Sequence, residues 1–167
     1  MHQGNREWLA YVQQTYGGYW KTSGVLELGA YNINGSAREY LISDVYVGVD
    51  QMAGPGVDIA MDAEKIDLGD RSFGCLVSVS MFEHTSRWRE ILDHNIQWSA
   101  PSGFVILSWG AEGNQPHEPF PWAAIPVGDV LEWAMQHKLD VLEAHWERSR
   151  FTADCPGCYD FIARRRA

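Results

Sequence analysis

The sequence predicts a three-layer α/β sandwich, with helices on both faces of a largely parallel sheet. Short apolar runs typical of strands alternate with helical segments along most of the chain, and only the last two strands are placed to form a hairpin. Alternation of this kind indicates parallel strands that are joined by helices. The chain has 167 residues, of which 46% are hydrophobic, so we expect residues 1–167 to form one globular domain.

Glycines and polar turns divide the first half of the chain into its elements. Apolar residues at helical spacing predict a helix over residues 6–14, which lies in an N-terminal helix-and-linker segment over residues 1–22. A short helix is expected over residues 37–42, with Ser36 as its N-cap. The predicted strands are 25–28, 46–49, 57–61 and 73–80. The last of these is almost continuously apolar, as a strand buried on both faces should be.

The second half of the chain continues the alternation. We expect a helix over residues 88–100, a turn at 101–103 and a strand over 104–109. A loop rich in Pro, Gly and Trp follows over residues 110–126, longer than most connections and placed to form the substrate side of a site. The remaining predicted elements are a helix over 130–138 capped by Asp129, and a final hairpin of strands 141–151 and 159–164.

Charge and composition exclude several classes of function. The chain has 22 acidic and 13 basic residues, a net charge of −9, which argues against nucleic acid as a partner. We interpret the run Arg164-Arg165-Arg166 as a solvated strand end in preference to a phosphate clamp. No apolar run approaches the roughly 20 residues of a membrane span. With three cysteines and no signal peptide, we expect a cytoplasmic protein without a membrane partner, either a monomer or a homodimer.

Polar groups follow four of the predicted strands where a ligand of an open α/β sheet binds, beyond the carboxyl ends. Gly29 allows a ligand to approach the backbone, and Asp50 is placed to accept both hydroxyls of a ribose. Asp62 and the backbone N–H of Ala63 can hold an adenine edge, and Ser80 ends the fourth strand. Together these strand ends predict a nucleoside site. Taken singly, each carboxylate could instead cap a nearby turn or helix.

Several motifs resemble a class I S-adenosylmethionine-dependent methyltransferase. The resemblance is carried by Val25-Leu26-Glu27-Leu28-Gly29, Asn32-Ile33-Asn34-Gly35-Ser36, Tyr46-Val47-Gly48-Val49-Asp50, Gly54-Pro55-Gly56-Val57-Asp58, Asp62-Ala63 and Phe82-Glu83-His84. It extends from about Val25 to Arg164, and it is the order and spacing of the motifs that make it specific. The family's glycine-rich loop has glycines two residues apart, whereas here Tyr31 stands in place of the second.

The resemblance implies a Rossmann-like sheet of seven strands whose last strand is antiparallel, and S-adenosyl-L-methionine as the cofactor. It places the ribose on Asp50 and the adenine amino group on Asp62, with Ser80 near the sulfonium. The cofactor-binding residues that it implies are Glu27, Gly29, Tyr31, Asn34, Gly35, Asp50, Gln51, Met52, Asp62, Ala63 and Ser80. It implies no metal.

Methyl transfer from a sulfonium is an in-line displacement that needs alignment of its reactants and, for a hydroxyl acceptor, a base. The candidate bases are His84 and His117, although a lone histidine is often only a satisfied polar group. Phe120 and Trp122 offer aromatic faces that could bind the acceptor. Because motifs typical of base or glutamine methylation are absent, we expect a hydroxyl of a small molecule or saccharide to be methylated.

Three other interpretations stay open. The chain could bind S-adenosylmethionine or another nucleotide without turnover, as a regulatory module. It could be an NAD-dependent oxidoreductase, although the segment from Gly29 to Gly35 lacks the G-x-G-x-x-G pattern of those enzymes. The pair Cys155 and Cys158 could form a redox or half-metal site, but Pro156-Gly157 between them is a good centre for an ordinary turn.

Overall fold

The computed structural model, which describes residues 3–111, 125–147 and 157–167, contains a seven-stranded sheet in the order β3-β2-β1-β4-β5-β7-β6. The strands are β1 (Val25–Leu28), β2 (Tyr46–Asp50), β3 (Ile59–Ala60), β4 (Phe73–Val79), β5 (Ser99–Gly110), β6 (Leu139–Glu147) and β7 (Cys158–Arg165). Neighbouring strands from β3 to β5 pair in parallel, and β7 is antiparallel to both β5 and β6. The predicted mostly parallel sheet with a C-terminal antiparallel hairpin is confirmed.

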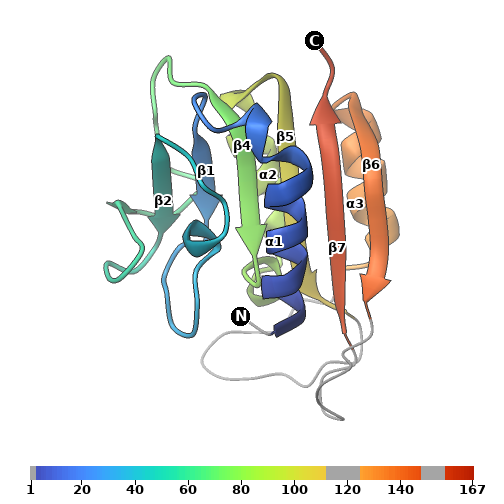
Figure 1. Ribbon diagram of the computed structural model, residues 1–167, viewed down its shortest axis with the longest axis horizontal. Coiled ribbons are helices and arrows are strands. Elements are labelled where there is room, and N and C mark those ends of the chain that lie inside the picture. The colour runs from blue at the N-terminus through green and yellow to red at the C-terminus, as the bar shows by residue number, and fades with distance from the viewer. Residues whose placement is uncertain (1–2, 112–124, 148–156) are drawn as a thin grey trace.

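Helices cover both faces of this sheet, which confirms the predicted three layers (Figure 1). Helix α1 (Gln3–Tyr16) packs Trp8, Leu9 and Val12 against one face. Helices α2 (Trp88–Asn95) and α3 (Val127–Gln136) pack against the other. Since successive side chains of a strand point to opposite faces, each buried strand contributes to both hydrophobic clusters. In β4, for example, Cys75 and Val77 lie under α1, whereas Leu76 lies on the α2 and α3 side.

The predicted helix over residues 88–100 is wrong at its C-terminal end. Helix α2 ends at Asn95, a 3₁₀ turn (Ile96–Trp98) follows, and β5 already begins at Ser99. Pro101 accounts for part of the difference, because it disfavours helical backbone at the preceding Ala100, and Ser99 already pairs with Phe73 of β4. The predicted turn at residues 101–103 therefore lies inside β5, where the pairing with β4 shifts register and Ser102 has a φ of +61°.

Three shorter elements also differ from their predicted form. Ser36 does cap a helix through its hydroxyl, but that helix is a single 3₁₀ turn (Ala37–Glu39). The third strand is only Ile59–Ala60. Helix α3 begins at Val127 with Pro126 at the N-cap, so Asp129 lies in the first helical turn and is not the cap. The carboxylate of Asp129 still stabilises the helix from that position, because the helix N-terminus carries partial positive charge.

The C-terminal arginines bind protein groups. Arg164 lies over the rings of Tyr19 and Phe104 and donates to the carbonyl oxygen of Ser102. Arg165 donates to the carbonyl of Ser99, and Arg166 pairs with Asp140 at 2.8 Å. These contacts agree with a strand end and not with a phosphate clamp. Among the helices that the structure describes, none is long and apolar enough to cross a membrane.

Candidate active site

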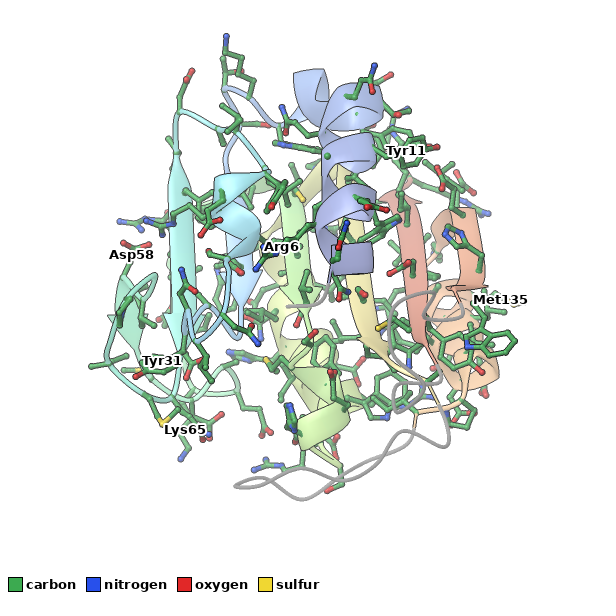
Figure 2. The ribbon with its side chains drawn as sticks, turned by 60° about the horizontal axis from the view of Figure 1, so that its bottom comes forward. Arg6, Tyr11, Tyr31, Asp58, Lys65 and Met135 are labelled. Carbon is green, nitrogen blue, oxygen red and sulfur yellow. The ribbon has the colours of Figure 1, made fainter. Side chains whose placement is uncertain are left out.

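A cavity of about 470 Å³ opens where the carboxyl ends of β1 to β4 meet. This volume is within the range of small-molecule pockets, roughly 300–1,000 Å³. The residues predicted for the site that line it are Gly29, Tyr31, Asp50, Gln51, Met52, Asp62, Ala63, Ser80 and His84. In Figure 2, Tyr31 of the cavity and the nearby Lys65 lie at one edge of the molecule, and Met135 of α3 lies at the opposite edge. The predicted clustering of four strand ends is therefore present.

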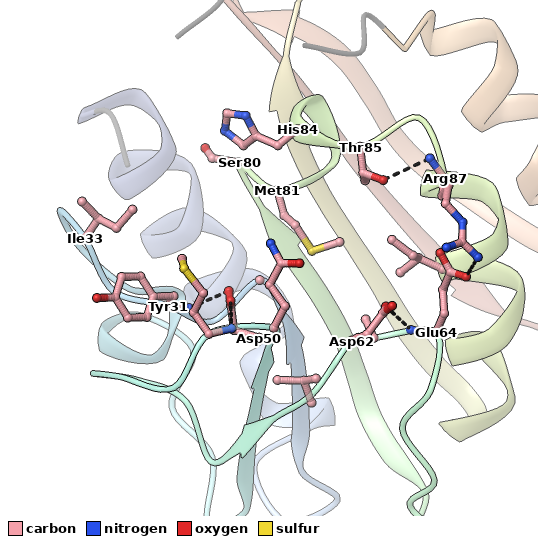
Figure 3. Close-up of a pocket in the computed structure, with 16 residues that line it drawn as sticks. Tyr31, Ile33, Asp50, Asp62, Glu64, Ser80, Met81, His84, Thr85 and Arg87 are labelled. Atoms are coloured by element: carbon pink, nitrogen blue, oxygen red, sulfur yellow. Dashed lines mark hydrogen bonds and ion pairs between the residues drawn. The ribbon is translucent and has the colours of Figure 1, made fainter. Parts of the chain in front are cut away.

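The carboxylate of Asp50, at the end of β2, is held by two backbone donors (Figure 3). Its Oδ2 accepts the N–H of Tyr31 at 3.2 Å, and its Oδ1 accepts the N–H of Met52 at 2.9 Å. Each carboxylate oxygen can accept a further hydrogen bond. The group is consequently fixed in position at the cavity and still able to accept hydroxyl groups of a ligand.

The loop after β1 is shaped by close backbone approaches. Gly29 has a φ of +79°, and a Cβ atom at this position would lie 2.6 Å from the Cβ of Met81. The ring of Tyr31 lies against Gly54, where an added Cβ would be 2.1 Å from a ring carbon. The N–H of Asn32 donates to the carbonyl of Pro55 at 2.8 Å. Tyr31, which stands where the family has a glycine, is thus accommodated by the segment that contains Gly54.

Asp62 lies on the same side of the cavity as β3. Its Oδ1 accepts the N–H of Glu64 at 3.0 Å, and its Oδ2 is 3.6 Å from Nζ of Lys65. The lysine is largely exposed, so this pair is weak. Asp62 therefore has lone pairs available to a donor in the cavity, such as an amino group.

Ser80 follows β4 in a backbone conformation that non-glycine residues rarely adopt, with a φ of +55°. Its N–H donates to the carbonyl of Ser108 on β5 at 2.8 Å, which fixes the chain as it leaves the sheet. A 3₁₀ turn (Phe82–His84) comes next and brings His84 to the cavity. Glu83 in the same turn is buried, and burial raises the pKa of its carboxyl to about 7.

Three predicted residues do not line the cavity. Glu27 is buried on the α1 face of β1, where its carboxylate accepts the hydroxyl of Tyr46 at 2.8 Å. Asn34 and Gly35 belong to the turn beside the cavity: Gly35 donates to the side chain of Asn32 at 2.8 Å, and the carbonyl of Asn34 accepts Arg6 at 2.9 Å. Asn34 and Gly35 therefore help to hold the turn in place, and neither lines the cavity.

His117, Phe120 and Trp122 lie outside the described residues, as does Cys155 of the predicted turn. Cys75 is fully buried. Within the described ranges, no group of three or more His, Cys, Asp or Glu side chains is arranged to hold a metal ion. The cavity has further lining residues that the sequence did not indicate: Ile33, Val49, Glu64, Met81, Thr85, Arg87 and Ile91.

Solved structures of other proteins share the fold of this chain, although no match is found at the level of sequence families. No protein-family model and no curated protein sequence matches the chain. Among solved structures, N-methyltransferase NodS from Bradyrhizobium japonicum WM9 matches with a TM-score of 0.73 and 16% identity, over 98% of this chain and 97% of that one. The chain has the fold of the class I S-adenosylmethionine-dependent methyltransferases.

Two further matches show what this methyltransferase fold holds in other proteins. The 1,6-didemethyltoxoflavin-N1-methyltransferase of Burkholderia thailandensis, crystallised with its substrate and S-adenosylhomocysteine, has a TM-score of 0.73 at 15% identity, over 99% of this chain and 84% of its own. The [4+2]-cyclase SpnF has a TM-score of 0.70 at 12% identity, over 99% of this chain and 82% of its own. One fold thus carries more than one named activity, so activity has to be argued from the site.

Proposed function

We propose that this chain binds S-adenosylmethionine in the cavity at the carboxyl edge of its sheet and catalyses methyl transfer to a small molecule. The observation that supports this is the convergence of Gly29, Asp50, Asp62 and Ser80, from four neighbouring strand ends, on one cavity of about 470 Å³. The chemistry of these groups fits a nucleoside with an amino acid tail. The shared fold is consistent with this assignment.

In the proposed complex each wall of the cavity has a distinct task. Asp50, already fixed by the backbone of Tyr31 and Met52, accepts the two ribose hydroxyls. Asp62 and the N–H of Ala63 bind the adenine edge, with Gln51 and Met52 beside the base. Gly29 and Tyr31 lie along the methionine part and Ser80 near the sulfonium, while Asn34 and Gly35 form the turn that follows in the same loop.

S-adenosylmethionine supplies the electrophilic methyl group, so the protein has to align the acceptor, exclude water and, where needed, remove a proton. His84 is the first candidate for the proton acceptor, because it lines the cavity at the end of the 3₁₀ turn that follows Ser80 and Met81. His117 is the second candidate, and Phe120 and Trp122 are proposed to bind the acceptor. A correctly placed base contributes about 10²–10⁴-fold to the rate.

The acceptor is proposed to be a small molecule, with a hydroxyl of a metabolite or saccharide as the first choice. NodS and the toxoflavin enzyme are N-methyltransferases by name, so an acceptor screen should contain amines and ring nitrogens as well as hydroxyl compounds. Nucleic acid is not expected as an acceptor, because the net charge of −9 opposes a polyanion.

Calorimetric titration with S-adenosylmethionine and S-adenosylhomocysteine tests the proposal. We expect the wild-type protein to bind both, and Asp50→Asn to lose most of this affinity because it removes the charge that accepts the ribose hydroxyls. Asp44→Asn is the matched control, since it makes the same charge change in an exposed residue before the amino end of β2. If the folded wild-type protein binds neither compound, the proposal is wrong.

The alternative of a binding module without turnover makes a different prediction for the same preparation. Such a module would bind S-adenosylhomocysteine with the same dependence on Asp50 but would methylate no compound of the screen. The [4+2]-cyclase SpnF is a reason to test this alternative, because its name shows that a protein with this fold can have an activity other than methyl transfer. A product carrying the labelled methyl group of S-adenosylmethionine would exclude it.

A further inference from the structure

Glu64 and Arg87 form an ion pair between two segments that bound the cavity (Figure 3). Glu64 follows β3 and Asp62, whereas Arg87 directly precedes α2, and both residues line the cavity. The Arg87 side chain extends toward Glu64 on the side of the cavity opposite Tyr31 (Figure 3). The side chain of Arg87 is 59% exposed and that of Glu64 13%, so the pair lies at the rim and not in the core.

Both residues are placed by short local hydrogen bonds. The N–H of Glu64 donates to Oδ1 of Asp62 at 3.0 Å, and the N–H of Arg87 donates to Oγ1 of Thr85 at 3.0 Å. The turn that positions Glu64 therefore begins at Asp62, the carboxylate proposed to bind the adenine amino group. Arg87 and Asp62 are consequently both oriented through Glu64.

The ion pair is not required to hold its two segments together. Nδ2 of Asn95, two turns further along α2, donates to the carbonyl of Ala63 at 2.8 Å, and Nε2 of His94 lies 2.8 Å from the carbonyl of Ile66. These contacts already attach α2 to the segment after β3. A rim-exposed ion pair adds little stability to such an arrangement. Its position on the cavity is better explained by contact with a ligand.

We infer that Arg87, oriented by Glu64, stacks its guanidinium plane on the base of the bound nucleoside. A guanidinium group is planar and weakly hydrated, so it packs on aromatic faces in a way that a lysine ammonium does not. Glu64 contributes by holding the plane in place before the ligand arrives. The inference rests on the proposed function, because it requires a nucleoside in this cavity.

The test compares binding of adenosine and of S-adenosylhomocysteine by calorimetry. Arg87→Ala should lower the affinity for both ligands by about tenfold, since the lost contact is with the base that they share. Arg87→Lys should recover little of this loss because it restores charge without a plane, and Glu64→Gln should cause a smaller loss. Arg89→Ala is the control: Arg89 lies two residues further along, in the first turn of α2, but contacts Gln136 and Asp129 of α3.

The outcomes separate this inference from the proposed function. If Arg87→Ala binds both ligands like wild type while Asp50→Asn does not, only the stacking role is overturned. Full recovery by Arg87→Lys would overturn it too, because charge alone would then suffice. A clear fall in the unfolding temperature of ligand-free Arg87→Ala would assign a structural role instead. If wild type binds neither ligand, both proposals fail.

Discussion

Glu27 is a carboxyl group that the fold buries on the α1 side of β1. Burial raises its pKa from 4.5 to about 7, partly offset by the hydroxyl of Tyr46 and the charge of Arg38. Between these two values the unfolded chain releases its proton while the folded chain keeps it, so stability falls as pH rises. The resulting loss in the free energy of unfolding is about 3 kcal/mol. It is absent well below pH 4.5 and complete above pH 7.

We therefore predict that Glu27→Gln gains stability relative to wild type as pH rises from 5 to 7. Glutamine has the same shape, accepts the Tyr46 hydroxyl and cannot ionise. The gain should approach about 3 kcal/mol, measured as the difference between urea unfolding curves at each pH. Glu83, whose pKa is also about 7, is present in both proteins and cancels in the difference. Parallel pH profiles for the two proteins would contradict the prediction.

The sequence predicted residues of the cavity that lie at the end of a strand or within two residues after it, as Gly29, Asp50, Asp62 and Ser80 do. Glu27, the residue before the last one of β1, does not line the cavity. Alternation of side chains along β1 puts Glu27 on the face of Val25, under α1. Ile91 and Arg87 were missed because they reach the cavity from α2 and the residue before it, and no strand-end signal marks them.

Helices α2 and α3 are joined by a polar contact that their hydrophobic faces do not reveal. Oδ1 of Asp93 on α2 accepts the indole N–H of Trp133 and Nε2 of His137, each at 2.8 Å. The rings of Trp133 and His137 pack 4.9 Å apart between their centroids. One carboxylate on α2 therefore satisfies two donors from the C-terminal part of α3, and Trp133 is fully buried.

We predict that Asp93→Ala destabilises the protein by about 1–3 kcal/mol, because it leaves the buried indole N–H of Trp133 without its acceptor. Asp93→Asn keeps one acceptor oxygen and should lose less. Asp70→Ala, in an exposed residue of the loop before β4, is the control and should change stability little. The measurement is chemical unfolding at pH 7. A loss from Asp93→Ala no larger than that of the control would refute the role of the contact.

Element types and order were predictable from periodicity, whereas element ends were not. The segment from Trp88 to Trp98 is apolar at helical spacing throughout, and nothing in that pattern marks the change at Asn95 to a 3₁₀ turn. The strand that follows includes Pro101, which a periodicity argument assigns to a turn. Pairing with β4 stabilises this extended segment, and such a partner is distant in sequence.

On the scale of the whole molecule, sheet order decides where the site lies. Strand β1 lies between β2 and β4 and is parallel to both, so the carboxyl ends of these strands converge on one edge. This order was not predicted from the sequence, because periodicity alone does not determine which strands are neighbours. The inference that residues 1–167 are one domain depends on whether helix α1 is an integral layer of the fold.

Helix α1 buries Trp8, Leu9 and Val12 on a sheet face that extends from β1 to β7. Nδ2 of its buried Asn5 also donates to Oγ of Ser108 at 2.7 Å. If α1 is an integral layer, Leu9→Ala should lower global stability by about 2–5 kcal/mol and leave a single cooperative transition. Far-ultraviolet circular dichroism and tryptophan fluorescence would then report the same midpoint. If the helix instead melted first, with a separate later transition for the sheet, α1 would be a peripheral segment and the one-domain prediction would be wrong.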